Sequence, residues 1–144
     1  MRPLRNIGAL GLVLFFWEAC QTHPLQHKLQ HADKVEVSFY KLKEGHTHKK
    51  YKTLILQDQK LKLVRGGILS AYAPHYKCSY NGSMTFYHQS KSLHPEPMEF
   101  NITCSGHIVY LHRGKLHSLK LSPELKSYLK NQLRTPAPRS KATQ

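Results

Sequence analysis

Acidic residues are scarce in this chain of 144 residues. Only 8 aspartates and glutamates accompany 22 lysines and arginines, so the formal net charge is +14 at pH 7. Such a charge describes solubility and partners rather than fold, and it favours anionic partners such as sulfated glycans, membrane surfaces, nucleic acid or acidic proteins. The 11 histidines add groups that gain charge as the pH falls toward 6.

A hydrophobic run long enough to span a membrane is also missing. The longest stretch of apolar residues and glycine, residues 7–17, is far shorter than the roughly 20 residues that a membrane helix needs. Arg2 and Arg5 precede it, and a basic start before a short apolar core is typical of a secretory signal peptide. We expect residues 1–22 to be a signal peptide and the chain to be secreted. An uncleaved anchor or a buried helix is the alternative.

Tryptophan occurs once, at Trp17 inside that apolar run. An immunoglobulin-like domain packs a tryptophan against its disulfide, so this class of receptor domain is disfavoured. Export also makes nucleic acid an unexpected partner.

Cysteine occurs three times. Cys20 lies at the end of the expected signal peptide, which leaves Cys78 and Cys104 as an even pair in an oxidising compartment. The sequence therefore predicts a Cys78–Cys104 disulfide. Two free buried thiols are the alternative.

Two sequons accompany the cysteine pair: Asn81-Gly82-Ser83 and Asn101-Ile102-Thr103. We predict glycosylation at Asn81 and Asn101. Alternation from Met98 to Cys104 predicts that Cys104 points inward and Asn101 outward.

The domain itself is predicted within residues 35–133, as a mainly β, single small antiparallel domain, sandwich or barrel-like, with one C-terminal α-helix. Alternating residues over 35–40 and apolar runs over 51–56, 61–64 and 68–73 indicate strands. Arg65-Gly66-Gly67, Asn81-Gly82 and the 112–115 segment indicate hairpins. Residues 134–144 are expected to be a disordered basic tail.

The closing helix carries its own signals. Ser122 is suited to the N-cap, Pro123 to the first helical position and Glu124 to the first turn. An apolar stripe then follows at helical spacing: Leu125, Tyr128, Leu129 and Leu133.

Residues 23–34 form a polar, histidine-rich segment. His23, His27 and His31 are spaced by four, so on a helix they would share a face that can bind metal. Because Pro24 interrupts the segment and no carboxylate or cysteine joins the set, we expect a solvated, partly disordered linker instead.

The sequence lacks the common catalytic motifs. The sequence has no His-Glu-x-x-His run, glycine-rich phosphate loop or Gly-x-Ser-x-Gly elbow. We expect the prolines beside Glu96 and Glu99 to separate the directions of these carboxylates. No enzyme activity, cofactor or metal site is predicted.

Lysines are the stronger functional signal, concentrated in the first half of the β region. If the strands there pair, these lysines form one positive face for a polyanion. Solubility and protection of sheet edges are the alternative. The lysines in question are Lys41, Lys43, Lys49, Lys50, Lys52, Lys60 and Lys62.

The stretch from Tyr51 to Leu121 resembles the propeptide domain of the adamalysin/reprolysin metalloproteases, which include the disintegrin-metalloprotease and thrombospondin-motif families. Cys78-Ser79-Tyr80-Asn81-Gly82 is similar to the family's Cys-x-Tyr-x-Gly, and Cys104-Ser105-Gly106 to its Cys-Ser-Gly. The stretch between the cysteines is longer than in the family, and we expect a stand-alone copy of the domain without the protease. The resemblance implies a non-catalytic binding module with a protein partner such as a metalloprotease; a cationic protein that binds sulfated glycans is the alternative.

Overall fold

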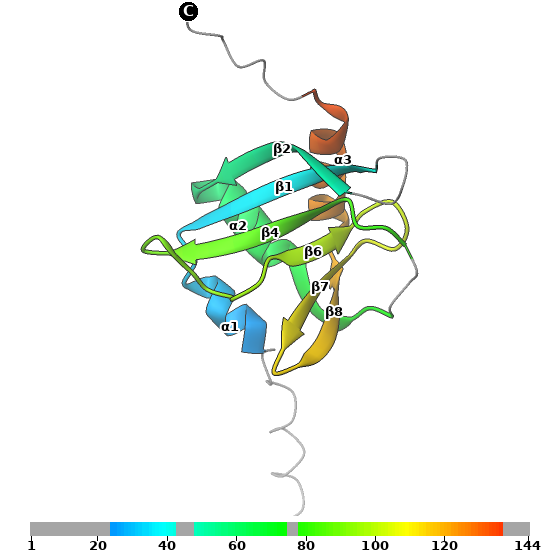
Figure 1. Ribbon diagram of the computed structural model, residues 1–144. Helices are drawn as coiled ribbons and strands as arrows, with labels where there is room; N and C mark the ends of the chain where they lie inside the picture. Colours follow the sequence, from blue (N-terminus) through cyan, green and yellow to red (C-terminus); the bar gives the residue numbers. More distant parts are fainter. Residues whose placement is uncertain (1–23, 43–47, 75–77, 137–144) are drawn as a thin grey trace, which may run out of the picture.

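The computed structural model describes residues 24–42, 48–74 and 78–136. They form one antiparallel sheet of eight strands and three helices (Figure 1). The strands are β1 (Lys34–Leu42), β2 (His48–Leu56), β3 (Ile68–Tyr72), β4 (Gly82–His88), β5 (Lys91–Ser92), β6 (Met98–Asn101), β7 (His107–His112) and β8 (Lys115–Leu121). The helices are α1 (Pro24–Gln30), α2 (Asp58–Gly67) and α3 (Pro123–Arg134).

The sheet is open and strongly curved, with the strand order β2-β1-β4-β6-β7-β8-β3 and β5 paired to β4 (Figure 1). The predicted class, a mainly β antiparallel domain with a C-terminal helix, is confirmed. The helices lie together on one side of the sheet, which we call the inner face. The helices form the second layer of the domain, which a sandwich would build from further strands.

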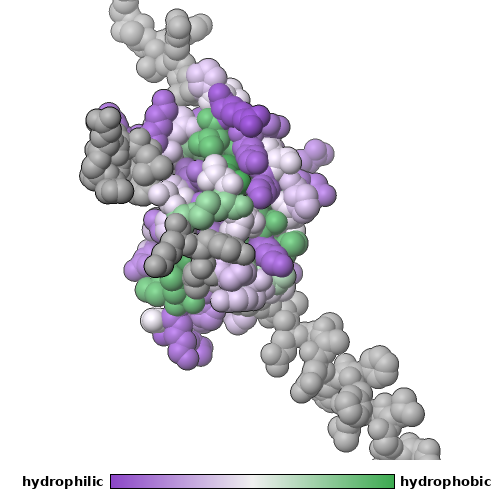
Figure 2. All heavy atoms as spheres, turned by 90° about the vertical axis from the view of Figure 1, so that its right-hand side faces the viewer, coloured by the Kyte–Doolittle hydropathy of each residue, from purple (hydrophilic) through white to green (hydrophobic). Residues whose placement is uncertain are grey.

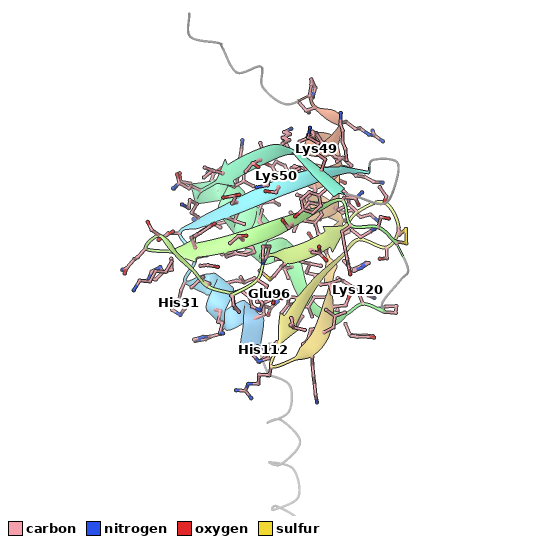
Figure 3. The ribbon with its side chains drawn as sticks, viewed as in Figure 1. His31, Lys49, Lys50, Glu96, His112 and Lys120 are labelled. Atoms are coloured by element: carbon pink, nitrogen blue, oxygen red, sulfur yellow. A yellow bond between two sulfur atoms is a disulfide. The ribbon has the colours of Figure 1, made fainter. Side chains whose placement is uncertain are left out.

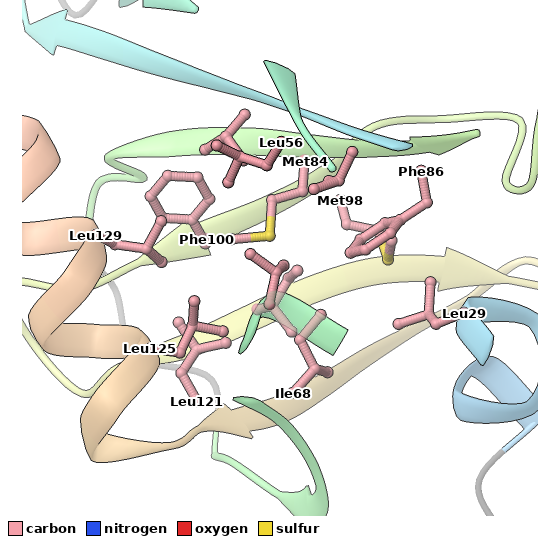
Figure 4. Close-up of a cluster of buried hydrophobic side chains, with 14 of the residues drawn as sticks. Leu29, Leu56, Ile68, Met84, Phe86, Met98, Phe100, Leu121, Leu125 and Leu129 are labelled. Atoms are coloured by element: carbon pink, nitrogen blue, oxygen red, sulfur yellow. The ribbon is translucent and has the colours of Figure 1, made fainter. Parts of the chain in front are cut away.

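Alternation along β1 builds the inner face. Val35 and Val37 are fully buried and lie opposite Phe86 and Met84 of β4. The same row continues from Met84 to Met98 of β6. Figure 4 shows Met84, Phe86 and Met98 in one cluster with residues of two helices, Leu125 and Leu129 of α3 and Leu29 of α1. The core therefore joins strands from both halves of the chain to all three helices.

Gly82 is required by a close approach of three strands. A Cβ atom there would lie 2.1 Å from the carbonyl oxygen of Ser38 and 2.6 Å from the Phe100 ring. The predicted Asn81-Gly82 hairpin is wrong for the same reason. Gly82 opens β4 between two neighbours, and Asn81 extends the ladder, donating from N to Phe100 O and accepting at O from Tyr40 N.

The 112–115 hairpin is confirmed. His112 pairs with Lys115, and the two residues between them have positive φ, 51° at Arg113 and 72° at Gly114. Positive φ at both central positions is the geometry of the type I′ turn, which matches strand twist.

The prediction of a strand over residues 61–64 and a hairpin at Arg65-Gly66-Gly67 is wrong, because these residues form α2. Leu61 and Val64, three positions apart, are buried on one helical side. A short apolar run does not distinguish a buried helix from a strand. Gly67 ends the helix beside Leu125 of α3. A Cβ atom at position 67 would lie 2.5 Å from the Leu125 side chain, so only glycine fits.

The expected linker is also wrong over its described part. Residues 24–30 form α1, and Leu25, Leu29 and Ala32 are buried in the core. Pro24, which was expected to interrupt the segment, is the first residue of the helix. At that position the missing N–H of proline would have no partner within the helix. The expected signal peptide and residues 137–144 of the expected tail lie outside the described residues, and Arg134 belongs to α3.

The α3 signals are confirmed. Ser122 Oγ accepts a hydrogen bond from Leu125 N at 3.2 Å, and Pro123 occupies the first helical position. Leu125 and Leu129 are fully buried, whereas Tyr128 and Leu133 pack at the edge of the core.

Candidate functional site

The predicted lysines do not form one face. Lys41 and Lys49 are cross-strand partners on β1 and β2, and Lys41 Nζ lies 5.0 Å from the centre of the Tyr51 ring. Lys50 pairs instead with Tyr40 and makes an ion pair with Glu36 at 3.4 Å. Figure 3 shows Lys49 and Lys50 side by side at the β2 edge. The lysine at position 43 lies outside the described residues.

Lys52 is not a surface lysine. Its side chain is buried, and Nζ donates to Gln132 O at 2.7 Å and to Thr135 O at 3.3 Å. Those carbonyl groups end α3, where a helix carries unpaired acceptors and partial negative charge. Burial lowers the pKa of Lys52. The prediction that Lys52 contacts a polyanion is therefore wrong.

Lys60 and Lys62 lie on α2 rather than on a strand, and both are exposed. Lys62 lines a hollow of about 390 Å³ between α1 and α2 together with Arg65 and the amides of Gln26 and Gln30. Arg65 Nη1 donates to Gln30 O at 2.7 Å and to Ala32 O at 3.2 Å, which fixes its position. This hollow combines two cations with two amide side chains.

The second half of the chain supplies cations that the sequence reasoning left out. Exposed side chains there include Lys91, Arg113, Lys115, Lys120 and Arg134. Figure 2 shows hydrophilic side chains spread over the side of the molecule to the right in Figure 1, with small hydrophobic areas between them. The signal was available in the sequence, because basic residues are frequent along the whole chain.

His112, at the turn between β7 and β8, lies near positively charged side chains. The pKa of His112 is lowered, first by desolvation and then by the charges of Arg113 and Lys28. Lys28 lies on α1, so this end of the molecule combines a helix and a hairpin that are far apart in sequence (Figure 3).

The Cys78–Cys104 disulfide is confirmed, with a Cα–Cα distance of 6.5 Å. The prediction that Cys104 points inward is wrong, because β6 ends at Asn101 and the alternation does not continue past it. Hydrogen bonds join the same two segments: Asn81 Oδ1 accepts from Ile102 N at 2.7 Å, and Asn101 Nδ2 donates to Ser79 O at 2.5 Å.

Asn101 is fully buried, so its predicted outward orientation is wrong. Its Oδ1 also accepts from Cys104 N at 2.8 Å. Both ends of the side-chain amide are thus used within the fold. Asn81 is half-buried, and its side chain bonds to the other segment through Oδ1 rather than through Nδ2, the nitrogen that carries a glycan.

Two acidic residues line one hollow on the outer face of the sheet, opposite the helices. Glu96 and Glu99 are both exposed at this hollow of about 410 Å³, and the separation of their directions stays a prediction. Tyr40 and Ser83 line it too, with the Tyr40 hydroxyl donating to Ser83 Oγ at 2.7 Å. The pKa of the neighbouring Tyr80 is raised by burial and, second, by the charge of Glu99. The hollow is an acidic spot on a cationic chain.

Comparison with protein-family models, curated proteins and solved structures finds no match. Within residues 24–42, 48–74 and 78–136, no helix has the length and hydropathy needed to cross a membrane.

Proposed function

We propose that this chain is a secreted, non-catalytic binding protein whose exposed cations bind anionic extracellular partners, above all sulfated glycans. One observation carries the proposal. Eleven lysine and arginine side chains are exposed, whereas the described residues contain a single lysine–carboxylate ion pair, Lys50–Glu36. Cations that are not paired within the molecule are available to an external anion.

The hollow between α1 and α2 is the best-formed place for a sulfate group. Arg65 is held by two backbone carbonyl groups, and exposed Lys62 lies on the same helix one turn earlier. Hydrogen bonds between a cation and an anion are stronger than neutral ones, and a guanidinium presents several donors in a fixed geometry. Gln30 adds a neutral polar group to the rim, whereas the Gln26 amide is already bonded to Ile68 O and Ser70 Oγ.

Heparin chromatography of the purified chain tests the proposal. We expect elution above physiological salt, and Lys62→Gln should lower the eluting salt concentration more than Lys91→Gln, which removes another exposed lysine that does not line the hollow. Equal small losses in both variants would indicate diffuse binding without a preferred site. Elution of the parent chain at or below physiological salt would reject polyanion binding.

A metalloprotease partner is the second candidate. The two segments that carry the resemblance to metalloprotease propeptides, residues 78–82 and 104–106, are joined by the disulfide, and the Asn81–Ile102 hydrogen bond ties the first segment to the residues just before the second. Binding to purified secreted metalloprotease domains, with their rates measured in its presence, tests this partner. No binding and unchanged rates would leave the resemblance without a functional counterpart. The chain itself should hydrolyse no peptide, ester or glycoside above background.

A further inference from the structure

Two histidines lie one turn apart on α1. The ring centroids of His27 and His31 are 5.3 Å apart, and both side chains are exposed. The helix is anchored from its other side, where Leu25 and Leu29 are buried in the core. The backbone therefore holds this histidine pair in a fixed position, while the rings themselves are in solvent.

A third histidine and a carboxylate come from other segments. His88 ends β4, and its ring centroid lies 6.5 Å from that of His31. Asp33, in the turn before β1, places Oδ2 3.7 Å from His88 Nδ1. Asp33 N donates to Tyr87 O at 3.0 Å, and Gln89 N donates to Asp33 Oδ2 at 2.7 Å. These two bonds tie the turn to the end of β4.

We propose that His27, His31, His88 and Asp33 bind a divalent transition-metal ion of the zinc or copper class, which bridges α1 to the end of β4. Imidazole nitrogens with one carboxylate oxygen are the donors that these ions prefer. Two imidazoles bound to one tetrahedral zinc ion at about 2.0–2.1 Å have ring centroids about 5 Å apart. The His27–His31 separation of 5.3 Å is close to that value, so the two rings can reach one ion once their side chains rotate.

Two features of the sequence argued against a metal site, the interruption by Pro24 and the lack of a further ligand, and neither holds in the fold. Pro24 begins α1 instead of breaking it, and both a carboxylate and a further histidine join the pair. A residue 57 positions beyond His31 supplies the third imidazole, which no local spacing indicates.

Binding requires the rings to turn. In the arrangement described, no group of three or more histidine, cysteine, aspartate or glutamate side chains among the described residues converges well enough to hold a metal ion. The four side chains are all exposed, so rotation about their side-chain bonds disturbs no core packing. A carboxylate has two oxygens and about four lone-pair sites, so Asp33 can bind metal and keep its bond from Gln89 N.

Titration of the tag-free, chelator-treated chain with zinc ions near pH 7.5 tests the site. Calorimetry should show one ion bound per chain with release of protons, and the melting temperature should rise because metal binds only the folded arrangement. His27→Gln and His88→Gln should each weaken zinc binding by roughly tenfold or more. His117→Gln, on β8, is the matched control and should leave it unchanged. Magnesium, which prefers oxygen ligands, should not bind.

Three results would overturn the proposal. The first is the absence of zinc and copper binding at micromolar concentrations. The second is binding that none of the substitutions weakens, which would place the metal elsewhere. The third is binding that His27→Gln weakens but His88→Gln leaves unchanged, because ligands on the helix alone do not bridge α1 to β4. Circular dichroism of each variant, compared with the parent, shows whether a loss reflects missing ligands or a disrupted fold.

Discussion

The ammonium group of Lys52 lies at the C-terminal end of α3, where the last carbonyl groups have no partner within the helix. It is charged and buried, and its hydrogen bonds to Gln132 O and Thr135 O compensate for lost solvation. Lys52→Met keeps most of the side-chain volume and removes those bonds. We expect the free energy of unfolding to fall by about 1–3 kcal/mol, measured by urea denaturation.

Lys50→Met is the matched control for Lys52, because Lys50 is exposed and its only described ion pair is with Glu36 at the surface. Exposed pairs contribute little, so its unfolding free energy should change by no more than about 0.5 kcal/mol. Equal effects of the two substitutions would contradict the helix-capping role.

Tyr110 provides a pH-dependent contribution. Burial raises its pKa from 10.0 to about 12. The folded state thus keeps the proton more strongly than the unfolded state does, so this contribution to stability is complete below pH 10 and is lost as the pH rises from 10 to about 12. The free energy of unfolding of the parent chain, measured by urea denaturation, should fall across that range. Tyr110→Phe should show a shallower dependence, and Tyr72→Phe, at an exposed position, should behave as the parent does.

Asn101 shows how tertiary contacts limit a modification motif. A glycan on Nδ2 would have to displace the hydrogen bond to Ser79 O from a fully buried position. We therefore expect site-by-site mass spectrometry of the chain from mammalian cells to find a glycan at Asn81 and none at Asn101. A folded, disulfide-linked product carrying a glycan at Asn101 would show that this segment takes another conformation.

At the scale of elements, α1 is an integral part of the core. Leu29 is 2% exposed and belongs to the same core cluster as residues of β2 and β3, the two ends of the sheet order. Leu29→Ala should lower the unfolding free energy by about 2–5 kcal/mol, because it leaves a cavity. Gln30→Ala, at an exposed position of the same helix, should change it by less than about 0.5 kcal/mol. Equal, small effects would restore the interpretation of this segment as a linker.

Elements with strong local signals were predictable. β1 follows from alternation, the β7–β8 turn from its glycine, and α3 from Ser122, Pro123 and a regular apolar stripe. α2 was missed because Leu61, Val64 and Ile68 fit a buried helix and a short strand equally well over so few residues. α1 was missed because its only core residues, Leu25 and Leu29, are separated by polar ones, and their burial depends on strands that come later in the chain.

The site residues were predictable only where their role does not depend on contacts with distant parts of the chain. The disulfide followed from the number of cysteines, which needs no knowledge of the fold. The lysine face failed because its members lie on two strands and a helix, and one of them, Lys52, is required by α3 about 80 residues later. The approach of His88 and Asp33 to α1 depends on the register of β4, which the sequence alone does not define.

At the scale of the whole molecule, the charge of +14 makes self-repulsion a destabilising term that salt should relieve. The described residues contain one lysine–carboxylate ion pair, so screening removes far more repulsion than attraction there.

We expect the melting temperature to rise as sodium chloride increases from low ionic strength to about 0.15 M, where the Debye length is about 8 Å. The rise should be larger near pH 5.5 than near pH 7.5, because the histidines add positive charge as the pH falls. Heparin retention should change in the opposite direction, weakening with salt, since the same exposed cations bind it. A melting temperature that falls with added salt at both pH values would show that attractive pairs dominate and that the cations are engaged within the fold.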